Sequence, residues 1–227
     1  MPSKGRVRTP EKVSVLATWV VPSARRVSVK SCSPRKRPVV KSFAAHRSCV
    51  RGVAAVSKLT LAALAARLGI RQPSLYKHID SLAGLRRDIA VQAKRDLGEV
   101  LARASAGRSG ADAISAMSHA YRAWALAYPG RYEASNLMPA PDDIEDETVS
   151  VTVIQVIADV LTAYRLEGDD AVDAIRAFRS TLHGFVSYES AGAFRWKADV
   201  DQSFERLIRG FIIALTHWAE ASTPADH

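Results

Sequence analysis

Two short helical patterns flank a glycine within residues 60–79, and this arrangement limits the possible folds more than any other feature of the sequence. Thr60 can cap the first helix, and Gly69 stands where a left-handed residue commonly ends a helix. A second helix is predicted over about Gln72–Ile79, with Pro73 in its first turn. The apolar positions of the pair are Leu61, Leu64, Ala65, Leu68, Leu75 and Ile79. Such a pair is typical of a helix-turn-helix.

The polar side chains of the second helix are of the types that contact DNA. Gln72, Ser74 and Lys77 can bond to base edges in the major groove. Arg71, Tyr76, Lys77 and His78 can donate to phosphates, which supply affinity but little specificity. The full set of candidate DNA-binding residues is Thr60, Arg71, Gln72, Pro73, Ser74, Tyr76, Lys77 and His78. The alternative is a solvated polar helix face in an ordinary bundle.

Basic residues are concentrated at the N-terminus. Residues 1–58 contain 14 Lys and Arg but a single acid, Glu11, whereas the remaining residues contain 18 basic and 22 acidic side chains. Residues 1–37 show no sustained helical or strand period and are predicted to form a basic, disordered segment. A weak helical pattern follows over 38–51. An alternative function is therefore non-specific nucleic-acid binding, or another interaction, through this basic N-terminus.

Downstream of the helix-turn-helix the pattern is almost wholly helical. Helices are predicted near 82–105, 111–128, 148–164, 168–192 and 201–221. The Val- and Ile-rich segment 148–164 is also compatible with a strand, but its apolar spacing favours a helix. The predicted fold class is all-α, with a helix-turn-helix domain over 38–88, a larger helical domain over 89–221 and a tail over 222–227.

Two segments resemble the tetracycline-repressor (TetR) family. LTLAALAARLGIRQPSLYKHIDSLAGL is similar to the family's DNA-binding core, and QPSLYKH is similar to its recognition helix. RSTLHGFVSYESAGAF and DVDQSFERLIRGFIIAL resemble the WHG type of ligand-binding domain. Two positions depart from the family pattern, because Leu82 replaces a common lysine and Leu182 replaces the Trp of the Trp-His-Gly signature. The resemblance spans roughly residues 52–221.

The family's first helix should directly precede the Thr60 helix, and residues 38–51 match it poorly. We therefore hypothesise that the sequence upstream of about Val50 is translated from a misplaced start or a shifted frame. Reading the genomic DNA in all three frames tests this idea, because a family-like first helix should appear in another frame.

The resemblance implies a cytoplasmic repressor that binds a palindromic operator in double-stranded DNA as a homodimer. It also implies release by a small-molecule effector, whose identity the sequence does not give. The candidate effector-binding residues are Met117, Trp124, Tyr128, Tyr132, Met138, His183 and Trp196, with His119 and Tyr121 weaker candidates. The candidate dimer interface comprises Phe178, Leu182, Phe185, Phe204, Ile208, Phe211 and Leu215. The alternatives are that these aromatic and methionine stripes are plain core and that both apolar faces are buried within one chain.

Other classes of protein find little support in the sequence. No nucleophile elbow, phosphate loop, dinucleotide fingerprint or His/Glu metal motif is present, so we expect no enzyme activity, cofactor or metal. The acidic run DDIEDE lacks a partnered base and is interpreted as solvated. Apolar runs fall short of the ~18 residues that span a bilayer, so no membrane association is expected.

Overall fold

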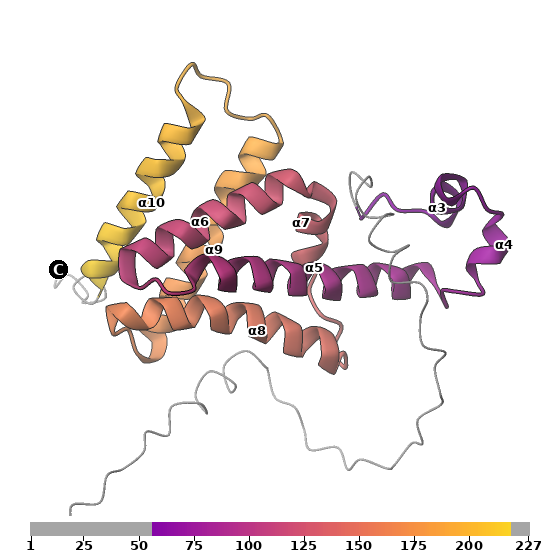
Figure 1. Ribbon diagram of the computed structural model, residues 1–227, viewed down its shortest axis with the longest axis horizontal. Coiled ribbons are helices and arrows are strands. Elements are labelled where there is room, and N and C mark those ends of the chain that lie inside the picture. Colours follow the sequence, from indigo (N-terminus) through magenta and orange to yellow (C-terminus); the bar gives the residue numbers. More distant parts are fainter. Residues whose placement is uncertain (1–55, 219–227) are drawn as a thin grey trace, which may run out of the picture. The chain divides into compact units, whose positions relative to one another are not determined.

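The computed structural model describes residues 56–218, and every regular element in that range is helical. The predictions for the segments 1–37 and 38–51 and for the family's first helix lie outside the described residues. The elements in chain order are α3 (Leu61–Leu68), α4 (Gln72–Leu75), α5 (Leu82–Ser105), α6 (Gly110–Ala127), α7 (Pro129–Ser135), α8 (Ile144–Leu161), the 3-10 turn η1 (Thr162–Tyr164), α9 (Gly168–Ser190) and α10 (Val200–Thr216) (Figure 1). The predicted all-α class is therefore confirmed.

Local sequence fixes the boundaries of the two short helices. The Thr60 hydroxyl accepts a hydrogen bond from the backbone N–H of Ala63 at 3.2 Å, which satisfies a free donor of the first turn of α3. Gly69 ends α3 with φ at +67°, a conformation that costs a residue with a Cβ atom about 1 kcal/mol or more. Ser81 caps α5 in the same way as Thr60 caps α3, by accepting from Gly84 at 2.9 Å.

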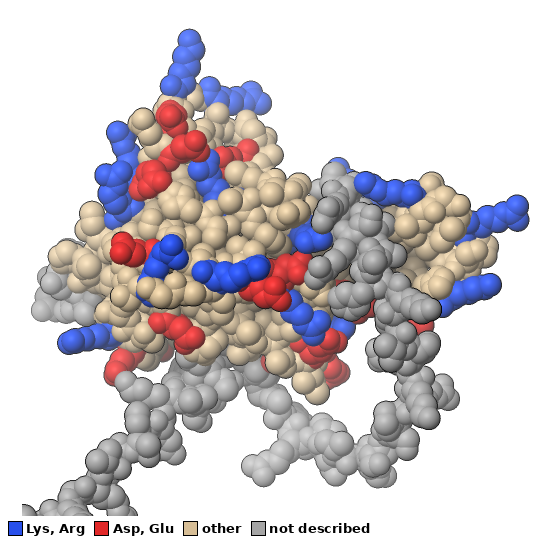
Figure 2. Space-filling model, in the orientation of Figure 1, with Lys and Arg blue, Asp and Glu red and all other residues tan. Residues whose placement is uncertain are grey.

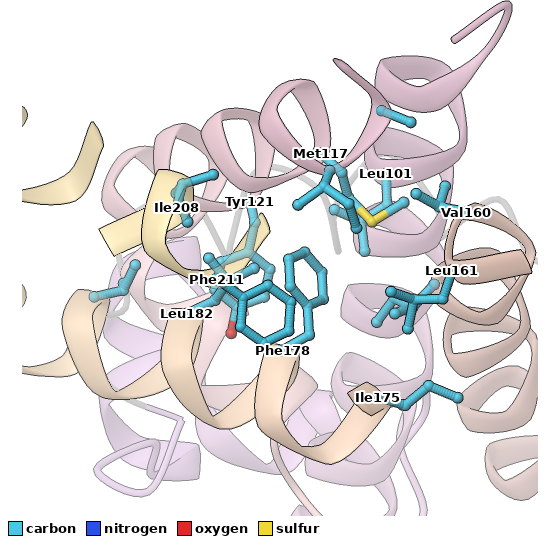
Figure 3. Packing of buried hydrophobic residues seen from close by; sticks show 14 of the residues in the cluster. Leu101, Met117, Tyr121, Val160, Leu161, Ile175, Phe178, Leu182, Ile208 and Phe211 are labelled. Carbon is cyan, nitrogen blue, oxygen red and sulfur yellow. The ribbon is translucent and has the colours of Figure 1, made fainter. Parts of the chain in front are cut away.

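Two hydrophobic cores form around these helices. The smaller core joins α3, α4 and the first turns of α5, and its buried residues are Val56, Leu59, Leu64, Ala65, Leu75, Leu85, Ile89, Ala93 and Ala134. The larger core collects the rest of α5 with α6 to α10, including Leu101, Met117, Phe178 and Ile208 (Figure 3). Because α5 supplies side chains to both cores, it is a continuous strut between them (Figure 1).

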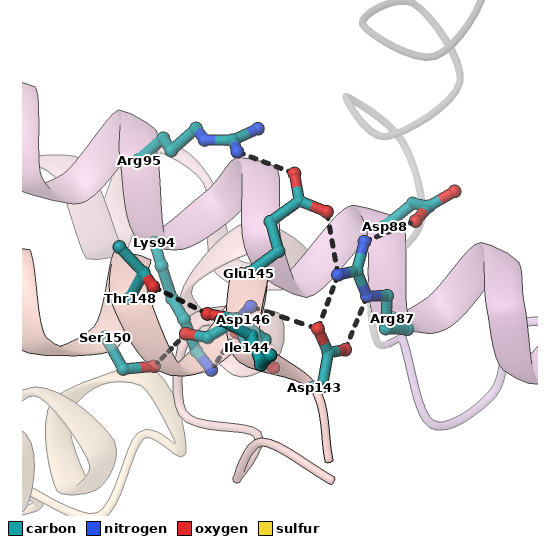
Figure 4. A network of polar contacts seen from close by, with 10 residues as sticks. All are labelled: Arg87, Asp88, Lys94, Arg95, Asp143, Ile144, Glu145, Asp146, Thr148 and Ser150. Carbon is teal, nitrogen blue, oxygen red and sulfur yellow. Dashed lines mark hydrogen bonds and ion pairs between the residues drawn. The ribbon is translucent and has the colours of Figure 1, made fainter. Parts of the chain in front are cut away.

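Helices α5 and α8 run side by side in the same direction. Arg87, Lys94 and Gly98 of α5 meet Asp143, Asp146 and Val153 in turn, so position advances along both helices together. A Cβ atom on Gly98 would lie 3.3 Å from the Val153 side chain, so glycine permits the close approach. These contacts join the acidic start of α8 to the basic face of α5 (Figure 4).

The contacts of α5 with α8 overturn the interpretation of the DDIEDE run as solvated. Lys94 Nζ lies 2.6 Å from Asp146 Oδ1, and both side chains are buried. Arg87 makes a bidentate pair with Asp143 at 2.6 and 2.5 Å and also contacts Glu145 at 2.8 Å, while Arg95 holds Glu145 at 2.7 Å (Figure 4). The hydrogen-bonded guanidinium of Arg87 lowers the pKa of Asp143 to about 2. The acids therefore anchor α8.

Three element boundaries differ from the sequence predictions. Helix α8 begins at Ile144 rather than near 148, because the Asp143 side chain caps it by accepting from Asp146 N–H at 3.1 Å. Pro129 and Gly130 do end α6, but Pro129 also starts the unpredicted helix α7, where its fixed φ suits the first turn. Helix α4 is regular only over Gln72–Leu75 and continues to Ile79 as hydrogen-bonded turns.

Helix α8 is also long and apolar enough to cross a membrane by length and composition alone. Its Ile157, Val160 and Leu161 are buried in the larger core, and Asp146 forms the buried pair with Lys94. We therefore interpret it as a core helix.

Candidate nucleic-acid interface

The second helix of the helix-turn-helix presents its polar residues outward and buries its apolar ones. Leu75 is 3% exposed and Ile79 packs against the smaller core, as the spacing predicts. Of the eight candidate DNA-binding residues, Ser74 is half-buried and the other seven are exposed, namely Thr60, Arg71, Gln72, Pro73, Tyr76, Lys77 and His78. The resulting surface is a row of polar side chains above Leu75 and Ile79, which pack in the smaller core.

The charge of this surface suits a polyanion. Between residues 56 and 81 the exposed cations are Lys58, Arg67, Arg71 and Lys77, against a single acid, Asp80. Figure 2 shows basic side chains extending from the α3–α4 end of the face in view, whereas acidic and basic side chains are mixed over the larger helical domain. Such a local excess of positive charge attracts DNA phosphates and steers association.

Leu82, which replaces a common family lysine, packs against the smaller core and begins α5. An apolar side chain at this place contributes to the core instead of to a phosphate contact. The neighbouring cation Arg86 is engaged as well, because it donates to the carbonyls of Ser57 at 3.0 Å and Leu59 at 2.8 Å. The cations available for DNA therefore lie on and around α4.

The predicted effector-binding residues separate into two groups. Met117, Tyr121, Trp124 and Tyr132 are buried together in the larger core, and Tyr128 packs at its edge with ring centroids 6.3 Å from Trp124. His183 joins them through Tyr132, whose hydroxyl lies 2.6 Å from His183 Nδ1. Met138 and Trp196 are 87% and 91% exposed, so the structure does not place either residue in this group. His119 instead lies 3.0 Å from Glu205.

Tyr121, Tyr132 and His183 form a chain of polar groups that runs from the apolar core to its edge, because the two tyrosines are buried and His183 is exposed. The Tyr121 hydroxyl lies 3.4 Å from that of Tyr132, and burial raises the pKa of Tyr121 well above its usual value. A separate cleft of about 480 Å³ lies between the C-terminal ends of α5 and α8. It is lined by Ala102, Ser105, Arg108, Ser109, Val156, Asp159, Val160, Thr162 and Ala163, none of which was predicted to bind an effector.

The predicted dimer-interface residues are mostly not available to a partner. Six of the seven are buried within one chain, with exposed fractions of 9% or less, namely Phe178, Leu182, Phe204, Ile208, Phe211 and Leu215, and Phe185 is half-buried against Phe204 and Phe194. The apolar faces of α9 and α10 pack on α6 and on each other, so the interface predicted from their width is wrong for these side chains.

Another face of the same two helices, here called the open face, is partly or fully exposed and lined by small or apolar residues. On α9 it carries Ala177, Thr181, Gly184 and Tyr188, and on α10 Ser203, Leu207, Gly210 and Ala214. A Cβ atom added at Gly184 or Gly210 would meet no atom within 4 Å. The hairpin that carries this face is braced by Arg122, which bonds Glu189 at the end of α9 and Asp201 at the start of α10.

Sequence reasoning missed the polar residues that join elements far apart in the chain. Glu133, Arg86, Arg87 and Lys94 each bond to a group at least 27 residues away. No spacing rule relates such pairs, because periodicity identifies a face of a helix but not its partner. Among residues 56–218, no cluster of three or more potential metal ligands is found.

Helix-turn-helix geometry, a basic reading edge and a larger helical domain together define a DNA-binding transcriptional regulator. Comparison with known proteins agrees. The family model "Tetracyclin repressor-like, C-terminal domain" matches residues 114–211. The HTH-type transcriptional regulator Rv0681 of Mycobacterium tuberculosis, itself uncharacterized, is 38% identical over 84% of this chain and 94% of its own length. The uncharacterized HTH-type transcriptional regulator YobS of Bacillus subtilis is 34% identical over 70% of this chain and 83% of its own.

A solved structure, described as that of the regulatory protein SCO4313, superposes with a TM-score of 0.59 at 26% identity. The match covers 74% of this chain and 91% of that one. The chain belongs to the TetR family of transcriptional regulators.

Proposed function

We propose that the protein is a repressor that binds a palindromic operator as a homodimer and is released by a small-molecule effector. The observation that carries the DNA-binding part is the outward polar edge of α4 and the turns after it, set on the buried Leu75. In this proposal Gln72 and Ser74 contact base edges, while Arg71, Tyr76, Lys77 and His78 contact phosphates. A repressor of this kind acts on DNA in the cytoplasm.

The homodimer is proposed to form through the open face of α9 and α10 that contains Gly184 and Gly210. Glycines with free space above them let helices of a partner approach closely. In the proposed dimer this face meets its own copy across a two-fold axis, which is the isologous arrangement most common among homodimers. The proposed pairing buries Leu207 and the exposed Tyr188, which one chain leaves at its surface.

The effector is proposed to bind beside Tyr121, Tyr132 and His183. This is an apolar region with a few convergent polar groups, which is the usual composition of small-molecule sites. An uncharged or weakly polar effector is therefore favoured over an anion or cation.

The test is footprinting of the full-length protein on the intergenic DNA beside its own gene, followed by affinity measurements on the protected duplex. Gln72→Ala should relax the preference at one symmetric pair of positions, by about 1–3 kcal/mol for each bidentate hydrogen-bonded pair that is removed. Binding that is identical for wild type and Gln72→Ala at every base would remove Gln72 from the reading surface. Binding that depends only on the basic residues 1–58 would replace the proposal by non-specific nucleic-acid binding.

A further inference from the structure

Helix α7 has only seven residues, yet it takes part in both hydrophobic cores. Tyr132 is 7% exposed and lies in the larger core, whereas Ala134, two residues later, is fully buried in the smaller core with Val56, Leu59 and Leu85. Within the described range 56–218, α5 and α7 are the two elements that contribute buried residues to both cores. A tilt of α7 would therefore displace a residue of the smaller core, which supports the helix-turn-helix.

Glu133 lies between these two residues in the sequence and hydrogen-bonds to the segment that leads into α3. Its carboxylate accepts hydrogen bonds from the backbone N–H of Val56 at 2.8 Å and of Ser57 at 3.2 Å, across 77 and 76 residues of sequence. Hydrogen bonds to a charged acceptor are about twice as strong as neutral ones. The carboxylate thus ties the larger domain to the peptide backbone of the smaller one.

The carbonyl groups of the same segment also accept hydrogen bonds. Arg86 of α5 donates to the carbonyl oxygens of Ser57 and Leu59 at 3.0 and 2.8 Å, and the backbone N–H of Leu59 donates to the carbonyl of Val56 at 3.1 Å. Val56 and Leu59 are 2% and 4% exposed. Three of the residues just before the cap of α3, namely Val56, Ser57 and Leu59, are consequently fixed on both their donor and acceptor sides.

The hydrogen bonds of Arg86 and those of Glu133 constrain different parts of the molecule. Arg86 lies in the part of α5 that packs in the smaller core, so its bonds hold the DNA-binding domain together internally. Glu133 belongs to α7, so its bonds join that domain to the larger one at a second place beside the continuous helix α5 and constrain the angle between the two. In a dimer joined through the larger domains, this angle determines how far apart the two α4 helices stand.

We propose that Glu133 is a positioning residue that sets the separation of the two recognition helices and so selects the spacing of operator half-sites. The proposal rests on the proposed function, because it needs a dimer that reads two half-sites. DNA contacts at each half-site are unaffected by Glu133, which lies on α7 rather than on α3, α4 or the turns that follow them. The residue should therefore control tolerance to spacing and not base preference.

The experiment measures affinity of the full-length protein for duplexes that carry the footprinted half-sites at centre-to-centre spacings changed in single base-pair steps. Wild type should lose about tenfold or more when the spacing changes by two base pairs, an amount comparable to one charge-assisted hydrogen bond. Glu133→Ala should reduce that loss to about threefold or less and leave the base preference within each half-site unchanged. Glu133→Gln should lie between them, because its amide oxygen can accept from one N–H group but its NH₂ cannot accept from the other.

Glu99→Ala is the matched control, because Glu99 is an exposed carboxylate on α5 whose ion pair with Arg103 spans 3.9 Å. It should keep the wild-type spacing profile. A folded Glu133→Ala protein with the wild-type profile overturns the proposal, and where that variant fails to fold, a wild-type profile for Glu133→Gln does so. A wild-type protein that binds no operator sequence-specifically instead overturns the proposed function itself.

Discussion

In the proposed complex the polar residues on and after α4 divide into residues that contact bases and residues that contact phosphates, and loss of the two kinds of contact should change affinity in different ways. Lys77 is exposed and belongs to the basic surface around α4. Lys77→Ala should weaken binding to cognate and scrambled duplexes alike and should lower the slope of log affinity against log salt by about 0.9 for each phosphate that is no longer neutralised. Titrations at several salt concentrations measure that slope. An unchanged slope would place Lys77 away from the backbone.

Tyr76→Phe isolates a hydroxyl group without a change of charge. Tyr76 is 56% exposed, so loss of its hydroxyl should not disturb folding. The variant should bind all sequences less tightly, by about 0.5–1.5 kcal/mol, because a phosphate contact carries no base information. The expected result is a parallel shift of cognate and scrambled affinities at a constant salt slope. A loss confined to the cognate duplex would instead assign Tyr76 to base recognition.

A pH dependence follows from Asp143, whose pKa falls from its ordinary 3.8 to about 2 because Arg87 hydrogen-bonds to its carboxylate. A lowered pKa in the folded state means that the ion pair stabilises the fold above pH 4, and that this contribution is lost as pH falls from about 4 through 2. Carboxyl chemical shifts in an NMR titration should give a midpoint for Asp143 near 2. Arg87→Ala should return the midpoint toward 3.8, and a midpoint unaffected by that change would refute the assignment.

At the scale of the element, hydrophobic periodicity and capping residues predicted much of the fold. Thr60, Gly69 and the buried Leu64 and Ala65 of α3 are local signals, and each lies where the pattern predicts it. Leu68, predicted on the same apolar face, is instead 41% exposed because it lies in the last turn of α3, beyond the smaller core. The apolar spacing places the start of α8 too late, because the acidic run before it also contains the cap Asp143 and the acids of the first turn. Helix α7 was missed because Pro129 and Gly130 indicate an end, and the same proline also suits a beginning.

Only part of the candidate site could be predicted, because helical spacing shows which side chains point away from a core but not which chain covers an apolar face. Exposure of Lys77 and His78 follows from the helical spacing around Leu75 and is confirmed, whereas Ser74, predicted on the same side, is half-buried. The faces of α9 and α10 were assigned wrongly because the width of an apolar stripe does not say whether the neighbour is the same chain or another. Phe178 and Phe211, with ring centroids 5.5 Å apart, show that the neighbour is the same chain.

The buried pair of Lys94 and Asp146 gives a prediction about how α5 and α8 hold together. Asp146→Ala should destabilise the protein by about 3–5 kcal/mol, because it leaves an uncompensated buried ammonium group. Replacing both residues, as Lys94→Met with Asp146→Leu, should recover most of that loss, since apolar side chains of similar size need no partner. Denaturant unfolding of the wild type, Asp146→Ala and the double variant measures this. A double variant as unstable as Asp146→Ala alone would show that the pair is not the cause.

The buried apolar faces of α9 and α10 are not the surface proposed to join two chains. Phe211 is 9% exposed and packs on Phe178 and Trp218, so Phe211→Glu should unfold the chain by placing a charge in the core instead of separating two folded subunits. Unfolding and dissociation are distinguished by comparing far-UV circular dichroism with molecular mass. That substitution therefore cannot test the interface.

Gly210→Trp can test it. Its Cβ position meets no atom within 4 Å, and a helix interior tolerates other residues better than glycine by up to about 1 kcal/mol, so one chain should fold normally. In the dimer the indole would occupy the space where the partner's helix approaches. Light scattering should then give the mass of one 24.7 kDa chain for Gly210→Trp, and twice that mass for wild type. Arg209→Trp, an exposed neighbour about 100° around the helix, should remain dimeric. Since a monomer contacts only one half-site, Gly210→Trp should also lose the dependence on half-site spacing that Glu133 is proposed to set. A dimeric Gly210→Trp protein would move the interface to another surface.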